Sequence, residues 1–279
     1  MHHAHSRESI SDKRSRAVAT LFNESMGRDI TRVSVRIAVV DSGVHAAHPH
    51  VGGVAGGIGI DANGRSHGDF IDRLGHGTAV TAAIKEKVPG AELHVIKLFD
   101  RDLTASVTAL VSALDWAVRH RMKIINLSLG TVRLQHERIL REAVRRALEQ
   151  NVIIVSARSD GGTWWLPGTL PGVVPVELDA SCPRDEYRVG LESGRPVIRA
   201  SGFPRPIPGV PPVQNLNGVS FAVANVTGFV AQVVEAWPEA SIDDVMWMLV
   251  NAAGQDVDET ADGLTRVRHS LGQHGGLRT

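Results

Sequence analysis

From Val35 onward, short apolar runs alternate with stretches in which apolar residues recur every three or four positions. The first pattern is typical of buried strands and the second of helices that pack on a sheet. Their alternation predicts an α/β fold in which crossover helices join the strands of a parallel sheet. The predicted strands are 35–40, 92–97, 124–127, 152–155 and 173–177. The predicted helices are 76–86, 105–119, 137–149, 220 to about 235, and 241–252, the last with Ser241 as its N-cap.

The same patterning divides the chain into three parts. Residues 1–33 are charged and form a separable N-terminal extension, which we expect to be flexible or regulatory. Residues 34–271 form the main domain, and residues 272–279 form a polar tail. Within the domain, residues 183–215 are rich in Pro, Gly and Arg, which predicts loops and edge strands.

Charge and composition narrow the classes of partner and location. Lys+Arg and Asp+Glu both number 30, so no net field favours a nucleic acid or an anionic membrane surface. The sequence has no uninterrupted apolar stretch of roughly 18 residues, so we expect no membrane-spanning helix. The polar N-terminus lacks the apolar segment of a secretory signal. Cys182 is the single cysteine, which excludes an internal disulfide framework and is compatible with a reducing compartment. We therefore expect a cytoplasmic protein.

Three fragments carry side chains that together make a nucleophilic triad. Asp41 follows a strand-like run, His76 lies between two glycines at the head of a predicted helix, and Ser220 opens another. A serine hydroxyl is a poor nucleophile until a base removes its proton, and a third group must orient that base. The three residues supply these roles, and their chain order of Asp, His and Ser is one of the known orders.

Fragments spread along the whole domain match the motifs of one enzyme family. They are Val40-Asp41-Ser42-Gly43-Val44 with His48-Pro49, Gly75-His76-Gly77-Thr78-Ala79-Val80, Ile125-Asn126-Leu127-Ser128-Leu129-Gly130, Leu166-Pro167-Gly168, Pro171-Gly172-Val173 and Asn217-Gly218-Val219-Ser220-Phe221-Ala222. On these fragments the chain resembles the subtilisin-like serine proteases, or subtilases. Ala79 departs from the pattern, because a second His is common there. The likeness spans roughly residues 35–271.

This resemblance implies a fold and a reaction. The fold is a subtilisin-like, three-layer α/β/α domain with a mostly parallel central sheet. Asp41 would orient His76, His76 would act as general base and acid, and Ser220 would attack a peptide carbonyl to form an acyl-enzyme. The expected function is a serine endopeptidase, an intracellular protease that processes a particular peptide. Two alternatives stay open: a pseudoprotease that binds peptides without cleaving them, and an acyl-transfer ligase or macrocyclase.

The chain departs from the family at the group that stabilises the oxyanion. The family uses an Asn side chain there, whereas an ungapped alignment places Asp160 at that position and a one-residue gap places Ser159 there. An amide donates hydrogen bonds, whereas an ionised carboxylate only accepts them. Val219 also replaces the Thr that usually precedes the nucleophile, although the backbone N–H of Ser220 remains. We therefore expect an atypical oxyanion hole, and loss of the side-chain donor costs roughly 10²–10³ in turnover, a magnitude measured on subtilisin itself.

By the same resemblance, the pocket for the residue before the scissile bond lies between Ser128-Leu129-Gly130 and Ser156-Ala157-Arg158. Trp165 aligns with a usually small residue near the floor of this pocket. If its ring points inward, the pocket is shallow and small side chains are preferred; otherwise Trp165 packs in the core. Arg158 either favours acidic substrate side chains or faces solvent.

We expect neither a metal ion nor a cofactor. Many secreted subtilases carry a calcium-binding loop in the helix that follows the catalytic His, but the stretch 83–90 has one carboxylate, too few oxygen ligands for that site. His45, His48 and His50 are closely spaced, which leaves zinc as an alternative. However, His48 belongs to the His-Pro pair of the resemblance, and the nearby Asp41 is assigned to catalysis. The expected partner is a peptide or protein substrate, with no nucleic acid and no membrane.

Overall fold

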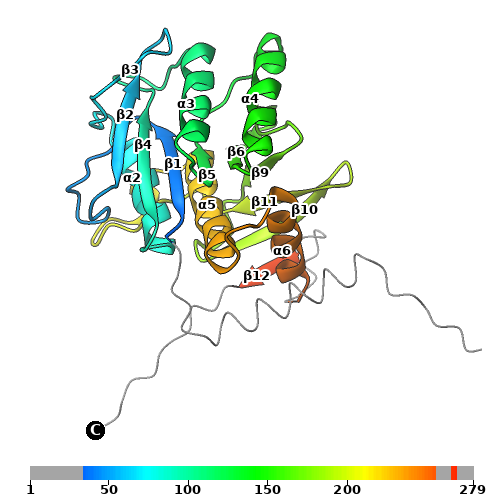
Figure 1. The fold of residues 1–279 in the computed structure, drawn as a ribbon. Helices are drawn as coiled ribbons and strands as arrows, with labels where there is room; N and C mark the ends of the chain where they lie inside the picture. The colour runs from blue at the N-terminus through cyan, green and yellow to red at the C-terminus, as the bar shows by residue number, and fades with distance from the viewer. Residues whose placement is uncertain (1–33, 256–264, 269–279) are drawn as a thin grey trace, which may run out of the picture.

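The computed structural model describes residues 34–255 and 265–268, and one large sheet forms the middle of the molecule (Figure 1). The strands are β1 (Arg36–Asp41), β2 (Gly56–Ile60), β3 (Ser66–His67), β4 (Glu92–Lys97), β5 (Ile124–Leu127), β6 (Ile153–Ala157), β7 (Ser159–Asp160), β8 (Thr163–Trp164), β9 (Val173–Leu178), β10 (Glu186–Glu192), β11 (Arg195–Ala200) and β12 (Thr265–Arg268). All except β7 and β8, which form a small separate hairpin, join the large sheet in the order β12-β10-β11-β9-β6-β5-β1-β4-β2-β3.

Every neighbouring pair from β11 to β2 in this order is parallel, whereas β10, β12 and β3 pair antiparallel at the two edges. The mostly parallel sheet expected from the sequence is therefore confirmed. Parallel strands need crossover connections, which usually contain helices that cover both faces of the sheet.

Helices supply the two outer layers. They are α2 (His76–Lys87), α3 (Val107–Arg119), α4 (Glu137–Glu149), α5 (Val219–Ala236) and α6 (Ile242–Gln255). One apolar core joins the sheet to α2, α5 and α6, and the other joins it to α3 and α4, which lie beside each other in Figure 1. In the central strand β1, Ile37 and Val39 belong to the first core, and Ala38 and Val40 to the second. A strand buried on both faces explains why this segment is apolar without alternation.

The predicted elements agree closely with the structure where apolar patterning is strong. The predictions 92–97, 124–127 and 137–149 coincide with β4, β5 and α4, whereas β6 begins and ends later than predicted. Ser241 caps α6 as expected, because its Oγ accepts a hydrogen bond from the Asp244 N–H at 3.2 Å. Residues 183–215 were predicted to form loops and edge strands, and they contain the antiparallel hairpin of β10 and β11 near one edge of the sheet. The extension 1–33 and the tail 272–279 lie outside the described residues.

The helix α5 occupies the centre of one core. By length and composition it is apolar enough to cross a membrane, but 78% of it is buried inside the domain. It packs closely against α2, because a Cβ added at Gly228 would lie 2.4 Å from Cδ and 2.7 Å from Cβ of Lys87. The Lys87 ammonium donates to the Arg184 carbonyl at 2.6 Å and lies 4.9 Å from the Phe229 ring centroid. Burial, helped by the charge of Arg184, lowers the pKa of Lys87 to about 8.

We predict that Gly228→Ala destabilises the protein. Helix propensity alone would stabilise an alanine here by about 1 kcal/mol. The new methyl group would instead overlap the Lys87 side chain, including its inflexible Cβ, and overpacking of this kind costs about 1–3 kcal/mol. Urea unfolding should show a lower midpoint with an unchanged slope. A midpoint at or above that of the wild type would contradict close packing of α2 on α5.

Candidate active site

Asp41 and His76 are joined by a short hydrogen bond where the end of β1 meets the start of α2. Asp41 is the last residue of β1 and is fully buried. Its Oδ1 lies 2.7 Å from His76 Nδ1 and accepts a second hydrogen bond, also at 2.7 Å, from the Ser42 N–H. Because the carboxylate accepts, the Nδ1 of His76 carries the proton and Nε2 is left as the basic nitrogen.

Glycines allow the start of α2 to reach the end of β1. Gly75, directly before the helix, has a φ of 79°, a left-handed conformation that favours glycine. A Cβ at Gly77 would lie 2.2 Å from the backbone oxygen of Gly43, so these two fragments can approach only without a side chain there. The Gly77 N–H donates to Ser42 Oγ at 2.9 Å. Backbone contact between the two fragments therefore fixes the position of the His76 backbone, from which the ring projects toward Asp41.

Two opposing effects set the charge state of His76. Burial lowers its pKa, but the hydrogen bond to Asp41 and the charges of Asp41 and Asp72 outweigh burial and raise the pKa above the usual value for histidine. The His76 ring also packs against Phe221, with the two ring centroids 5.3 Å apart. A general base must be unprotonated, so the capacity of His76 to act as one is lost as the pH falls through this raised pKa.

Ser220 is the second residue of α5, next to the Phe221 ring that contacts His76. Its hydroxyl donates to the Ser128 carbonyl oxygen at 3.2 Å. Within the described part of the chain, that carbonyl, and not a nitrogen of His76, is the partner of the hydroxyl. The Ser220 N–H lies in the first helical turn, where N–H groups have no partner within the helix. This donor lies at the positive end of the α5 dipole.

A buried chain of hydrogen bonds fixes Ser128 relative to α5. The Ser128 hydroxyl donates to the Ser220 carbonyl at 3.3 Å and accepts from Asn126 Nδ2 at 2.8 Å. Asn126 Oδ1 in turn accepts from the Thr227 hydroxyl at 2.9 Å. Asn126 and Thr227 are fully buried, so the end of β5 and the first two turns of α5 are held together in the core.

The two oxyanion candidates lie on the β7–β8 hairpin that follows β6. The Ser159 hydroxyl donates to Glu177 Oε1 at 2.9 Å, so its proton is directed toward β9. Asp160 is exposed at the end of β7, ahead of the turn glycines. Neither side chain has a hydrogen bond to Ser220 among the contacts of the described residues. The assignment of Asp160 or Ser159 to the oxyanion hole stays a prediction.

Glu177 also decides the environment of Arg158. The Arg158 guanidinium binds Glu177 Oε1 at 2.5 Å and lies 4.1 Å from the Trp164 ring centroid. The Arg158 side chain is only 15% exposed. The sequence alternative in which Arg158 faces solvent is therefore wrong. Because Glu177 already neutralises the guanidinium, the second alternative, a preference for acidic substrates, is also weakened.

Trp165 lies between the two predicted walls of the substrate pocket. Its backbone N–H donates to the Arg158 carbonyl at 2.9 Å, and the following residue, Leu166, exchanges backbone hydrogen bonds with Thr131. A Cβ at Gly130 would lie 3.1 Å from Trp165 Cε3, so the ring stands against the Ser128–Gly130 wall. Of the two sequence alternatives, this contact favours a shallow pocket. Leu129 and Ala157 on these walls are buried.

Metal-ligand geometry is absent from the described residues, which contain no group of three or more His, Cys, Asp or Glu side chains placed to hold an ion. His48 and His50, which the sequence left as a zinc alternative with His45, are in edge contact at 5.2 Å between ring centroids. The His48 Nδ1 accepts from the His50 N–H at 3.2 Å, an arrangement of a local turn.

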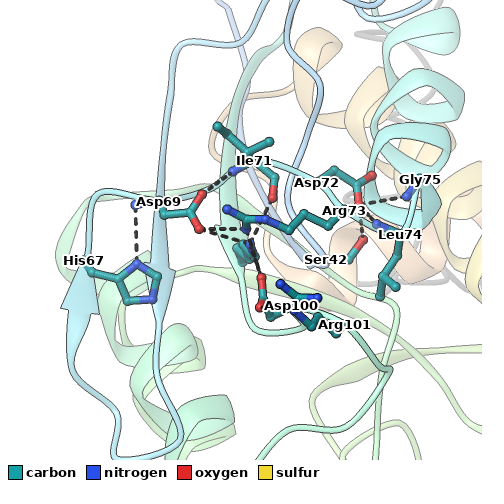
Figure 2. A network of polar contacts seen from close by, with 11 residues as sticks. Ser42, His67, Asp69, Ile71, Asp72, Arg73, Leu74, Gly75, Asp100 and Arg101 are labelled. Carbon is teal, nitrogen blue, oxygen red and sulfur yellow. Dashed lines mark hydrogen bonds and ion pairs between the residues drawn. The ribbon is translucent and has the colours of Figure 1, made fainter.

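A charged network next to Asp41 was not predicted from the sequence. Lys97, the last residue of β4, is the register partner of Asp41 and is only 4% exposed. Its ammonium bridges Asp69 at 3.3 Å and Asp100 at 2.8 Å, and Arg73 bridges the same two carboxylates at 2.7 and 2.9 Å (Figure 2). These side chains line a cavity of about 540 Å³.

Sequence comparison places the domain among known proteins. Residues 33–182 match the Subtilase family model, a span that holds Asp41 and His76 but ends before Ser220. The chain is 34% identical over 142 residues to the minor extracellular protease Epr of Bacillus subtilis, covering 48% of this chain and 21% of that protein. It is 29% identical over 234 residues to a thermostable alkaline protease of Halalkalibacterium halodurans, covering 77% of this chain and 61% of that protein. The chain thus spans less than two thirds of each of these two relatives.

Solved structures share the fold at low sequence identity. A cold-adapted subtilisin-like serine proteinase matches with a TM-score of 0.66 at 18% identity, covering 88% of this chain and 92% of that one. A lanthipeptide protease matches with a TM-score of 0.63 at 19% identity, covering 86% of both chains. The prenylagaramide maturation protease PagA matches with a TM-score of 0.58 at 22% identity, covering 88% of this chain and 90% of that one.

We predict that Glu177→Gln destabilises the protein by about 1.5–3 kcal/mol at pH 7, since it removes a charged acceptor from Ser159, Arg158 and Arg199. Burial raises the pKa of Glu177, but these three groups outweigh burial and lower the pKa below its usual value. Its stabilising contribution is therefore present above the unfolded pKa of about 4.3 and is lost as pH falls through the folded pKa.

The measurement is urea unfolding at neutral and acidic pH, and the matched control is Glu192→Gln. Glu192 is more exposed and pairs with Arg199 only, so its replacement should cost at most about 1 kcal/mol. Equal losses of unfolding free energy in the two variants, or a Glu177→Gln loss that grows at low pH, would show that Glu177 does not stabilise the β7–β8 hairpin through Arg158 and Ser159.

Proposed function

Because the chain belongs to the subtilase family of serine proteases, we propose that it is a serine endopeptidase whose triad is Asp41, His76 and Ser220. The observation that carries this proposal is the 2.7 Å contact between the buried Asp41 carboxylate and His76 Nδ1. It leaves Nε2 as the basic nitrogen of a ring that packs against Phe221, the residue that follows Ser220. An oriented imidazole with a raised pKa is what a serine nucleophile needs for activation.

The first step is removal of the Ser220 proton by His76 Nε2. In the structure the hydroxyl donates to Ser128, so it must turn from that carbonyl toward the imidazole before it reacts. Such rearrangements are common, because catalytic hydrogen bonds often form fully only when substrate is bound. Ser220 Oγ then attacks the peptide carbonyl, and Asp41 stabilises the imidazolium that forms. The imidazolium gives its proton to the leaving amine, and water hydrolyses the acyl-enzyme by the reverse sequence.

The oxyanion of this step would be held mainly by the Ser220 N–H. That donor lies in the first turn of α5, where the helix dipole adds a favourable field. The Ser159 hydroxyl is turned to Glu177, which leaves Asp160 as the remaining side-chain candidate. A carboxylic acid donates only when protonated. We therefore propose a slow or specialised enzyme whose oxyanion hole lacks an ordinary amide donor.

The substrate is proposed to be one particular peptide rather than proteins in general. A weakened oxyanion hole supports slow processing, and Trp165 against Gly130 supports a small side chain before the scissile bond. Two of the solved structures with this fold are titled as a lanthipeptide protease and a maturation protease. A cytoplasmic location is part of the proposal, supported by the single buried Cys182.

A peptide-binding pseudoprotease is the second candidate function. The observation that favours it is the Ser220 hydroxyl bonded to Ser128 instead of the base. In that case the hydroxyl would stay on this carbonyl when a peptide binds.

We predict that a fluorophosphonate probe labels the wild-type protein and that Ser220→Ala abolishes the labelling. The probe reacts only with an activated serine, so it tests whether Ser220 turns toward His76. Labelled protein is counted by fluorescence after denaturing electrophoresis, with His76→Ala as a second control. A folded wild-type protein that stays unlabelled would support the pseudoprotease and contradict the proposed protease.

We predict that Asp160→Asn increases turnover at neutral pH, because the amide supplies a donor that the ionised carboxylate lacks. The measurement is kcat on a peptide that the wild type cleaves. Ser159→Asn is the matched control, which tests the alignment with a one-residue gap. If kcat falls or stays constant in Asp160→Asn, Asp160 does not limit stabilisation of the oxyanion.

A further inference from the structure

The loop between β3 and α2 contains a second carboxylate, Asp72, close to the catalytic base. Asp72 lies four residues before His76 and is half-buried next to Ser42 and the first turn of α2. Its Oδ1 accepts hydrogen bonds from the Ser42 hydroxyl at 2.8 Å and from the N–H groups of Leu74 and Gly75 at 2.9 Å (Figure 2). Its Oδ2 accepts from the N–H and the hydroxyl of Thr78 at 2.8 and 2.6 Å.

These contacts make Asp72 the cap of the helix that carries His76. The residue at the N-cap position, Gly75, has no side chain with which to accept a hydrogen bond. Asp72 takes over this role by accepting from the Thr78 N–H, which belongs to the first turn of α2. A second first-turn donor, the Gly77 N–H, donates to Ser42 Oγ, whose own proton goes to Asp72. One connected set of hydrogen bonds therefore satisfies two N–H groups in the first turn of α2.

Ser42 links this cap to the catalytic acid. Its backbone N–H donates to Asp41, and its hydroxyl lies between Gly77 and Asp72. Ser42 is fully buried, so these hydrogen bonds do not compete with solvent. Any movement of Asp72 would therefore shift the first turn of α2, and with it His76, relative to Asp41.

Asp72 also acts on His76 through its charge. His76 is the first residue of α2, where the helix dipole and burial both disfavour a protonated imidazole. The charged groups that face its ring are Asp41 from β1 and Asp72 from the loop before α2, while α5 contributes the uncharged Phe221. Asp72 is ionised, because its hydrogen-bond donors outweigh burial and lower its pKa. Both carboxylates thus favour the imidazolium that forms during the reaction.

We propose that Asp72 is a positioning residue for the catalytic base: through Ser42 and the first turn of α2 it fixes His76 against Asp41, and through its charge it stabilises the protonated imidazole. The proposal rests on the proposed function for its kinetic consequence only. The position and charge of His76 can be measured whether or not the protein cleaves peptides.

The first test is an NMR titration of His76 in the full chain, with its signal identified by its absence from His76→Gln. In Asp72→Asn the ring should titrate at a lower pH than in the wild type. The matched control is Asp69→Asn, a change in the same loop to a carboxylate that binds Arg73, Lys97 and the Ile71 N–H. That variant should leave the His76 titration unchanged. Equal titration of His76 in wild type and Asp72→Asn would overturn the proposed effect of its charge.

The second test separates position from charge. Ser42→Ala removes the hydroxyl that joins Asp72 to the Gly77 N–H. It keeps the Asp72 carboxylate and its direct hydrogen bonds to Thr78, so the His76 titration should stay near that of the wild type. The value of kcat should fall about tenfold to a hundredfold with little change in KM, since His76 would be held less accurately. In Asp72→Asn, kcat should fall as well, and the acidic limb of kcat/KM should move to lower pH. A wild-type kcat in folded Ser42→Ala would overturn the positioning role, and this variant decides the matter if Asp72→Asn does not fold.

Absence of peptidase activity from the wild type would contradict the proposed function alone. The NMR titration would then still decide whether Asp72 sets the charge state of His76. The two proposals therefore fail in different experiments.

Discussion

The site is organised by the need to satisfy a charged carboxylate at the buried end of β1. Burying Asp41 is costly unless donors compensate for the lost water. One donor, the Ser42 N–H, comes from the chain itself, but the second, His76, has to be brought from the start of another helix. That approach is possible only because Gly77 lacks a side chain against Gly43. This contact sets where α2 begins, and α2 in turn packs against α5, the helix whose second residue is Ser220.

Elements with strong apolar patterning were predictable from the sequence, and others were not for identifiable reasons. The strand β1 is a continuous apolar run, whereas β2 has the sequence Gly-Gly-Ile-Gly-Ile, in which few side chains indicate a strand. In β10, Arg188 is only 6% exposed, because Asp179 neutralises it with a 2.5 Å ion pair. A buried arginine interrupts the apolar pattern by which a buried strand is predicted. Its partner, Asp179, lies in a loop that apolar patterning does not identify. Long-range charge pairs of this kind are invisible to periodicity.

The same distinction applies to the site. Asp41, His76 and Ser220 could be proposed as a triad because each lies in a recognisable fragment at the end or start of an element. The role proposed for Asp72 could not be, since the contact that joins it to the segment of Asp41 is the Ser42 hydroxyl, 30 residues away along the chain. Arg158 was predicted to meet either substrate or solvent, and it meets Glu177 instead. Residue type and spacing thus identified the candidate reactive groups, while the contacts that orient and neutralise charged side chains depended on tertiary structure.

The burial of α5 has a mechanical consequence for the proposed reaction. The helix whose second residue is Ser220 is packed into the core along most of its length, and Ser128 and Asn126 join its start to the end of β5. A helix packed in this way is a rigid support. Under the proposed function, the peptide would therefore be brought to Ser220, and the Ser220 hydroxyl would rotate to meet it.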